Sequence, residues 1–202
     1  AISTGIGGVV YEICWYMRGL EQWFIDMIKN PRFCEVLLDK TLKFWMDYYV
    51  GFMAQVGDIV DIIRFGDDLG MNTGPFMDAD TYRKFFKPRH KILCDYVKTH
   101  SKMHTFIHSC GSISLLMPDM IEAGIEIFNP VQTRTYKMAP EFLKKEFGKD
   151  CTFWGGGIET VGILNHGTPE QIRDQVFERM EIFSEGGGYV FNTVHNILPD
   201  VP

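Results

Sequence analysis

A histidine and a cysteine lie two positions apart in the stretch FIHSCGS, residues 106–112. The stretch has the pattern of a strand end, where residues i and i+2 project to the same face, so His108 and Cys110 form a two-ligand pair. Zinc binds imidazole nitrogen and thiolate sulfur, and a catalytic zinc uses three protein ligands with a fourth position open. His195, in FNTVHNILPD, is our candidate for the third ligand. The alternative is core packing, because cysteine and strand histidine are usually buried residues without chemistry.

Two carboxylates follow an earlier predicted strand in FGDDLG. Because side chains alternate along a strand, only one of Asp67 and Asp68 faces the same side as the zinc ligands. That residue is a candidate catalytic proton carrier, or a hydrogen-bond acceptor for a ligand imidazole. An N-cap or loop carboxylate is the competing interpretation.

Three further polar residues follow later strands and are candidates for substrate binding. Asn129 and Gln132 come from FNPVQ, where Pro130 also suits a purely structural turn. Glu159 follows the glycine cluster WGGG, which permits close approach of the backbone to a ligand but is also typical of a tight turn.

Strands and helices alternate along most of the chain. Helical spacing from Leu20 to about Gln55 predicts two helices that break at Asn30, with Pro31 opening the second. Asp78 or Asp80 is the expected N-cap of a helix that runs to about residue 100. We predict five strands, each separated from the next by a helix, over residues 58–66, 103–109, 125–129, 151–155 and 188–194.

This alternation predicts an α/β protein with a parallel sheet, because a parallel crossover needs about a dozen residues and a helix supplies them. No G-x-G-x-x-G motif lies between a strand and a helix, and polar residues recur at the strand ends, so we favour a (β/α)₈ barrel over an open sheet. Residues 1–202 then form one barrel domain. A barrel has eight strands in about 250 residues, so we expect three N-terminal strands to lie outside this chain.

The barrel geometry also bears on the choice of the third ligand. His195 ends the last strand, on the same rim as His108 and Cys110. Cys151 begins its strand and lies at the opposite end. The other cysteines, in helical or pre-helical segments, are Cys14, Cys34 and Cys94.

Composition limits the class of protein. The 202 residues are 46% hydrophobic and carry a net charge of −6, which is typical of a globular protein with a sizeable core. The acidic balance argues against a nucleic-acid partner, and no stretch approaches the roughly 18 to 20 apolar residues of a membrane span. Five scattered cysteines without a secretory signal read as reduced thiols. We therefore expect a cytoplasmic protein.

Seven collinear stretches make the chain resemble the uroporphyrinogen decarboxylase family over nearly its whole length. The resemblance implies a (β/α)₈ barrel. It also implies one of two activities: decarboxylation of a tetrapyrrole without a cofactor, or zinc-dependent methyl transfer with a corrinoid protein. The stretches are RGLEQWFIDMIKNP (18–31), GDDLGMNTGPFMDADTYRKFFKPRHK (66–91), FIHSCGS (106–112), LMPDMIEAGIEIFNPVQ (116–132), FWGGGIET (153–160), HGTPEQIRDQV (166–176) and VHNILPDVP (194–202).

The H-x-C-G sequence resembles the methyltransferase branch, whose metal motif continues with a cysteine near the last strand. His195 stands at that position here, where the decarboxylases carry a histidine in a similar context. The acidic residue and arginines on which the decarboxylases depend lie near their N-terminus, in the part that we expect to be missing here. We therefore predict a zinc methyltransferase acting on a small methylated substrate or a thiol acceptor with a corrinoid protein.

Two alternatives to the methyltransferase stay open. The first is a uroporphyrinogen decarboxylase of porphyrin biosynthesis. The second is a non-catalytic barrel subunit that docks a corrinoid protein or a like subunit, as in a homodimer.

Overall fold

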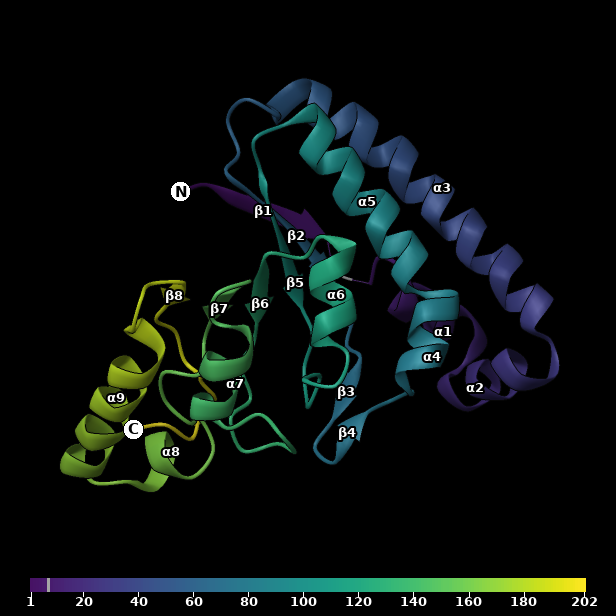
Figure 1. The fold of residues 1–202 in the computed structure, drawn as a ribbon. Helices are drawn as coiled ribbons and strands as arrows, with labels where there is room; N and C mark the ends of the chain where they lie inside the picture. The colour runs from purple at the N-terminus through teal and green to yellow at the C-terminus, as the bar shows by residue number, and fades with distance from the viewer. Residues whose placement is uncertain (7) are drawn as a thin grey trace.

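A six-stranded parallel sheet forms the centre of the molecule (Figure 1). The computed structural model describes residues 1–6 and 8–202. The strands follow one another in the sheet in chain order, each joined to the next by a helical crossover, as in the wall of a barrel. The α/β barrel-type fold is therefore confirmed. The strands are β1 (Ser3–Ile6), β2 (Ile62–Gly66), β5 (His104–His108), β6 (Ile127–Asn129), β7 (Thr152–Trp154) and β8 (Tyr189–Val190).

Among the described residues the sheet has six strands rather than the five predicted, because β1 was not recognised. β1 lies at the very start of the chain, where a four-residue strand shows no alternating pattern, and it exists by pairing with β2 in the register Ser3 to Ile62. The last strand was predicted over 188–194 but covers only Tyr189–Val190. The chain after β8 has instead left the sheet and carries His195 towards β5.

Nine helices are present in the part of the chain that the structure describes. The predicted break at Asn30 is confirmed, and so is Asp78 as an N-cap, since its carboxylate accepts a hydrogen bond of 2.7 Å from Thr81 N. The segment after Asp78 was predicted as one helix but divides at Phe86, because Pro88 in the first turn of the second helix donates no backbone hydrogen bond. The helices are α1 (Tyr11–Arg18), α2 (Leu20–Lys29), α3 (Pro31–Val56), α4 (Ala79–Phe85), α5 (Lys87–His100), α6 (Met117–Ala123), α7 (Pro140–Phe147), α8 (Ile163–His166) and α9 (Pro169–Ser184).

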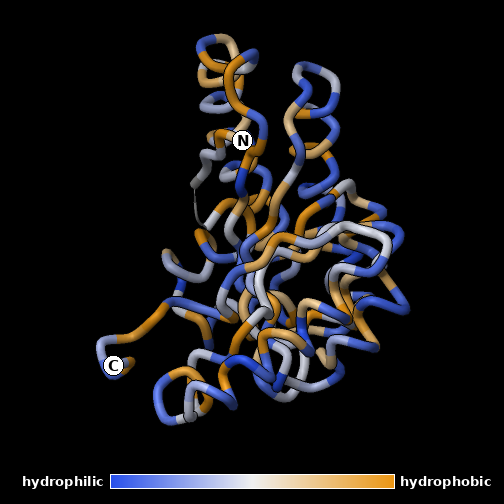
Figure 2. The backbone as a smooth tube through the Cα atoms, turned by 90° about the vertical axis from the view of Figure 1, so that its left-hand side faces the viewer, coloured by the Kyte–Doolittle hydropathy of each residue, from blue (hydrophilic) through white to orange (hydrophobic). Residues whose placement is uncertain are grey.

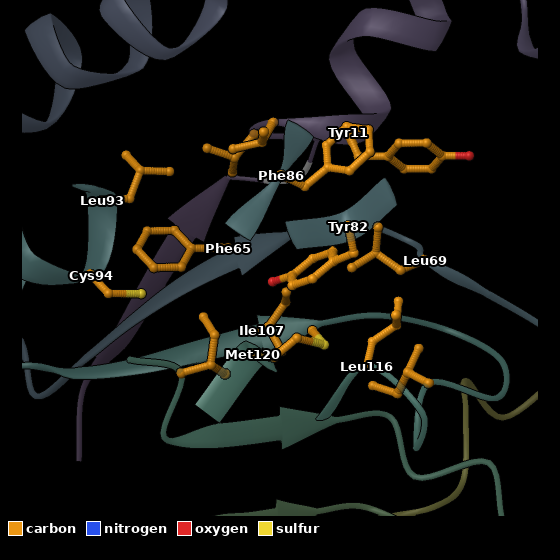
Figure 3. Close-up of a cluster of buried hydrophobic side chains, with 14 of the residues drawn as sticks. Tyr11, Phe65, Leu69, Tyr82, Phe86, Leu93, Cys94, Ile107, Leu116 and Met120 are labelled. Carbon is orange, nitrogen blue, oxygen red and sulfur yellow. The ribbon is translucent and has the colours of Figure 1, made fainter. Parts of the chain in front are cut away.

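The two faces of the sheet bury different side chains. Phe65 of β2 and Ile107 of β5 point towards the helices, where they join the main hydrophobic core with residues of α1, α4, α5 and α6 (Figure 3). The hydropathy of the chain alternates along the helices, as expected when one helical face packs on a sheet (Figure 2). The opposite, inner face of the sheet carries a smaller apolar cluster of Ile62, Phe106 and Ile127, with Trp154 packed against it.

A short hairpin, β3 (Gly70–Met71) and β4 (Gly74–Pro75), follows β2 and packs on the loop after β5. These two short strands, outside the six-stranded sheet, were not predicted either. None of the described helices has the length and apolar character needed to cross a membrane.

Candidate metal centre

Three side chains predicted as metal ligands converge at the carboxyl end of the strands. His108 is the last residue of β5, Cys110 lies two residues further on, and His195 follows β8. Cys110 Sγ lies 3.6 Å from His108 Nε2 and 3.5 Å from His195 Nε2. One ligand atom from each of the three residues lies within 4.8 Å of the other two. Residues 85 positions apart in sequence thus share one site.

These distances fit the geometry of a zinc ion. In a tetrahedral site with zinc–nitrogen bonds of about 2.0 to 2.1 Å and a zinc–sulfur bond of about 2.3 Å, a nitrogen and a sulfur ligand lie about 3.6 Å apart. Both nitrogen–sulfur distances here have that value to within a tenth of an ångström. The three residues are half-buried, and His108 and His195 line a cavity beside them. The donor set therefore suits zinc with a fourth position free.

Asn129 sets the orientation of the His108 ring. Its Oδ1 lies 2.7 Å from His108 Nδ1, and its Nδ2 donates a 2.8 Å hydrogen bond to Trp154 O, which fixes the amide. His108 Nδ1 must then carry the proton, and Nε2 keeps its lone pair for a cation. Burial lowers the pKa of His108 and outweighs the opposite effect of the Asn129 hydrogen bond. The ring is therefore neutral at pH 7. Asn129, predicted to orient substrate, lines the cavity beside the cluster and also holds a candidate ligand.

Cys110 is positioned through its backbone. Asp68 Oδ1 accepts a hydrogen bond of 2.8 Å from Cys110 N. Burial raises the pKa of the Cys110 thiol to about 12, and the negative charge of Asp68 adds to this effect. Without a compensating cation the thiol keeps its proton at neutral pH. Metal binding at this site is consequently coupled to proton release.

The glycine after Cys110 is required by a close backbone contact. Gly111 has a φ of +82°, and a Cβ there would lie 2.3 Å from the carbonyl carbon of Gly70 in β3. Gln132 accepts a hydrogen bond from Gly111 N. Gln132 was also predicted to bind substrate, and its contact is with the backbone of the ligand loop.

Asp67 and Asp68 have different surroundings, as alternation along β2 requires. Asp67 is fully buried, and its carboxylate accepts hydrogen bonds of 2.9 to 3.0 Å from the backbone nitrogens of residues 10–12 at the start of α1. Its Oδ2 also lies 2.9 Å from His90 Nε2, and His90 Nδ1 lies 2.9 Å from the Tyr82 hydroxyl. These partners occupy Asp67, so of the two predicted catalytic carboxylates only Asp68 is brought to the cluster.

Glu159 lies apart from the three ligand residues. Its carboxylate is buried and accepts a hydrogen bond from the Thr133 hydroxyl, while its backbone nitrogen donates to Gln175 Oε1 at 2.8 Å. The predicted substrate contact has no counterpart in this geometry. Glu159 instead links the loop after β7 to α9.

A cavity of about 630 Å³ extends from the ligand cluster along the inner face of the sheet. It is lined by His108 and His195, by the aromatic rings of Phe106 and Trp154, and by Arg64 of β2. The rings of Phe106 and Trp154 meet edge to face at 5.5 Å. A larger hollow of about 1220 Å³ lies at the opposite end of the strands and includes His104 and Cys151 in its lining, but it is remote from the ligand cluster.

The model of the uroporphyrinogen decarboxylase (URO-D) family matches residues 5–202. The chain belongs to the URO-D family. Its curated relatives include a methylated-thiol–coenzyme M methyltransferase of Methanosarcina mazei, 25% identical over 122 residues. They also include uroporphyrinogen decarboxylases of Pseudoalteromonas translucida, 56% identical over 36 residues, and of Chlorobium phaeobacteroides, 24% identical over 181 residues.

This URO-D chain spans about half of its relatives' length, or less. The three matches cover 58%, 18% and 87% of the chain, but only 30%, 10% and 47% of the respective relatives. A solved structure of a methyltransferase from Methanosarcina mazei superposes on the whole chain with a TM-score of 0.73, at 21% identity and over 54% of that protein. This likeness shows that the two share a fold.

Two residues of this URO-D chain at the site were not predicted from the sequence. Arg64 could have been found, because alternation along β2 puts it on the same face as Ile62. Glu12 in the first turn of α1 gave no signal beyond an ordinary helical glutamate. It is largely buried, accepts a hydrogen bond of 2.9 Å from the Tyr16 hydroxyl, and has a pKa raised by burial.

Proposed function

We propose that the protein is a zinc-dependent methyltransferase that moves a methyl group between a small substrate or thiol and a corrinoid protein. The observation that carries the proposal is the convergence of His108 Nε2, Cys110 Sγ and His195 Nε2 at distances suited to one zinc ion. The corrinoid partner follows from the resemblance of the H-x-C-G sequence to the methyltransferase branch.

The surrounding residues suit this role. A bound zinc ion would act as a Lewis acid at its open position, lowering the pKa of a thiol or polarising the oxygen or nitrogen that carries a methyl group. Asn129 holds the His108 ring, and Asp68 holds the Cys110 backbone. Phe106 and Trp154 supply an apolar patch on the inner side of the cavity, against which the carbon atoms of a substrate could pack.

Metal analysis tests the ligand set. The protein is expected to bind one zinc ion per chain, and Cys110→Ala should abolish this binding. Cys151→Ala removes a thiol at the opposite end of the sheet and serves as the matched control. Full zinc occupancy of Cys110→Ala by elemental analysis would show that Cys110 is not a ligand.

Activity assays test the reaction. With methylcobalamin as the methyl donor and small thiols as acceptors, we expect methyl transfer by the wild-type protein and by Cys151→Ala, and none by Cys110→Ala. The reaction class is wrong if the zinc-loaded wild-type protein leaves the methyl-corrinoid unchanged.

A second candidate function is decarboxylation of uroporphyrinogen. It is favoured by the 56% identity to the Pseudoalteromonas translucida enzyme, although that match covers only 36 residues. Incubation with uroporphyrinogen followed by porphyrin chromatography decides between the two. Formation of coproporphyrinogen would establish the decarboxylase.

A further inference from the structure

His195 is held in place differently from His108. The ring of His108 is oriented by Asn129 Oδ1 at 2.7 Å. The ring of His195 has Cys110 Sγ, at 3.5 Å, as its only hydrogen-bonding contact in the part of the chain that the structure describes. The position of His195 Nε2 therefore depends on the backbone that carries it, which is the segment after β8.

This segment lies against three consecutive glycines, residues 155–157, which follow β7. β7 and β8 are neighbours at one edge of the sheet (Figure 1). Beyond the two strands, Gly155 N donates a hydrogen bond of 3.1 Å to Val190 O, and Gly157 N donates one of 2.8 Å to Asn192 O. The glycine segment thus supports the chain after it has left the sheet.

The two residues directly before His195 are fixed by the same contact region. Val194 is buried, and its backbone nitrogen donates a hydrogen bond of 2.9 Å to Ile158 O. The Thr193 hydroxyl donates a hydrogen bond of 2.6 Å to His195 O, which closes a short turn at the ligand residue. His195 therefore takes its position from contacts that begin at the glycine segment.

The glycines are needed because a side chain would separate the two segments. A Cβ at Gly157 would lie 2.5 Å from the ring of Phe191 and 2.8 Å from Asn192 O. The ring can turn aside, but the carbonyl belongs to the backbone that leads to His195. Gly155 has a φ of +123°, and a Cβ there would lie 3.3 Å from Thr193 O. Close approach of the two backbones thus requires glycine.

The same stretch of chain also contacts the support of the other histidine. Trp154 O, directly before the glycines, accepts the hydrogen bond of 2.8 Å from Asn129 Nδ2 that fixes the amide. A Cβ at Gly155 would lie 3.7 Å from the same nitrogen. Because Asn129 orients His108, residues 154–157 contact the supports of both ligand histidines.

We propose that residues 154–157, together with the Thr193 hydroxyl, are the positioning element of the metal centre and hold His195 at the distance from Cys110 that a single metal ion requires. The sequence WGGG is compatible with a tight turn or with close approach to a ligand. Its contacts favour close approach to another part of the chain. This inference rests on the proposed metal site, whereas it does not depend on the transfer of a methyl group.

Cobalt(II) is the probe for the first test, because its visible absorption depends on the number and geometry of its ligands. We expect the wild type to bind one cobalt ion, and Gly157→Ala to bind it at least about tenfold more weakly and with an altered spectrum. Gly148→Ala creates a similar contact, 2.5 Å from Lys144 O, at the opposite end of the sheet. It should keep the affinity and spectrum of the wild type, as should Gly51→Ala, where a Cβ meets no atom within 4 Å.

Two further variants keep the proposal testable if Gly157→Ala does not fold. Adding Phe191→Ala to Gly157→Ala removes the contact with the ring and leaves the contact with Asn192 O, so cobalt binding should still be weakened. Thr193→Val removes the hydrogen bond to His195 O and should also alter the spectrum, whereas Thr193→Ser keeps the hydroxyl and should restore it. Wild-type spectra in all the variants at positions 157 and 193 would overturn the proposal.

Crystal structures of the metal-free proteins separate this inference from the proposed function. Cys110 Sγ and His195 Nε2 should lie 3.5 Å apart in the wild type and further apart in Gly157→Ala. If the wild type binds neither cobalt nor zinc while Gly157→Ala still displaces His195, the proposed metal chemistry fails and the positioning role stands. An unchanged distance in Gly157→Ala would show that the glycine segment does not position His195.

Discussion

Asn129 determines which nitrogen of His108 is free, so its removal should weaken metal binding without changing any ligand. In Asn129→Ala the His108 ring loses its Nδ1 partner and can adopt the other tautomer or rotate. We expect zinc affinity to fall by about 10- to 100-fold, as for other partners of ligand histidines. Competition with a chromogenic chelator measures this change.

Asn30→Ala is the matched control for this experiment. Asn30 is exposed at the start of α3 and its side chain makes no capping hydrogen bond. An equal loss of zinc affinity in both variants would contradict the assignment of Asn129 as a positioning residue.

The sequence identified the three ligand candidates but not what holds them. Alternation along a strand places His108 beside Cys110, and His195 follows the last strand at the same end of the sheet. Both inferences require only the local secondary structure and the direction of the strands. The bond between Asn129 and His108 joins neighbouring strands, and its existence depends on the register of β5 against β6. A single sequence contains no signal for that register. For this reason the contact of Asn129 with His108 could not be predicted.

At the scale of elements, the loop after β5 fits against β3 only because residue 111 is glycine. Gly111→Ala would add the strain of a positive φ, about 1 to 2 kcal/mol, to a Cβ that lies 2.3 Å from the carbonyl carbon of Gly70. The loop must then move and take Cys110 with it. We expect this variant to lose both stability and zinc binding, measured by urea unfolding and elemental analysis.

Gly186→Ala separates the two contributions. Gly186 also has a positive φ, +68°, but a Cβ there meets no atom within 4 Å. Gly186→Ala should lose only the stability that corresponds to the conformational strain, and it should still bind zinc. Equal losses of stability in the two variants would show that the contact with Gly70 is unimportant.

Asp67, directly after β2, binds the start of α1 through hydrogen bonds to its backbone. Asp67→Ala leaves the backbone donors of residues 10–12 and the His90 ring without their buried acceptor. The expected destabilisation is at least about 3 kcal/mol. Asp78→Ala, which removes an exposed N-cap, should cost about 1 kcal/mol. Urea unfolding of both variants compares them, and a smaller loss for Asp67→Ala would contradict this structural role.

The elements that the sequence predicted well have strong local signals. Pro31 opens a helix, and Asp78 caps one. The errors lie in segments whose secondary structure depends on contacts with residues far away in the sequence. β1 is a strand because it pairs with the edge of β2, and the residues after β8 leave the sheet and line the cavity.

At the scale of the whole molecule, α4, α5 and α6 are joined through one buried carboxylate. Asp119 Oδ1 lies 2.9 Å from Arg83 Nε and 2.7 Å from Lys87 Nζ. Burial alone would raise the pKa of Asp119, but the hydrogen bonds from Arg83 and Lys87 outweigh it and lower the pKa below its ordinary value of 3.8. The ionised carboxylate therefore stabilises the fold above about pH 4, and this contribution is lost as the pH falls through the lowered pKa.

Asp119→Asn should consequently be less stable than the wild type at pH 7 and at pH 5, with the difference shrinking as the pH falls below about 3.8. Urea unfolding at pH 7, 5 and 3 measures the free energies. Asp174→Asn, on the exposed face of α9, should show no such difference at any pH. A gap between Asp119→Asn and the wild type that widens towards pH 3 would mean that the sign is wrong.

Because the five cysteines differ in burial, the number of reactive thiols can report the fraction of protein that holds a metal ion. Cys110 is the most accessible of the five thiols; Cys151 is only 8% exposed, and Cys14, Cys34 and Cys94 are fully buried. An aromatic disulfide reagent at alkaline pH should thus modify one thiol in the native protein and five after denaturation. Zinc at the site would shield that single sulfur. The number of thiols that react before and after a chelator is added would then report what fraction of a preparation holds metal, with no variant and no substrate.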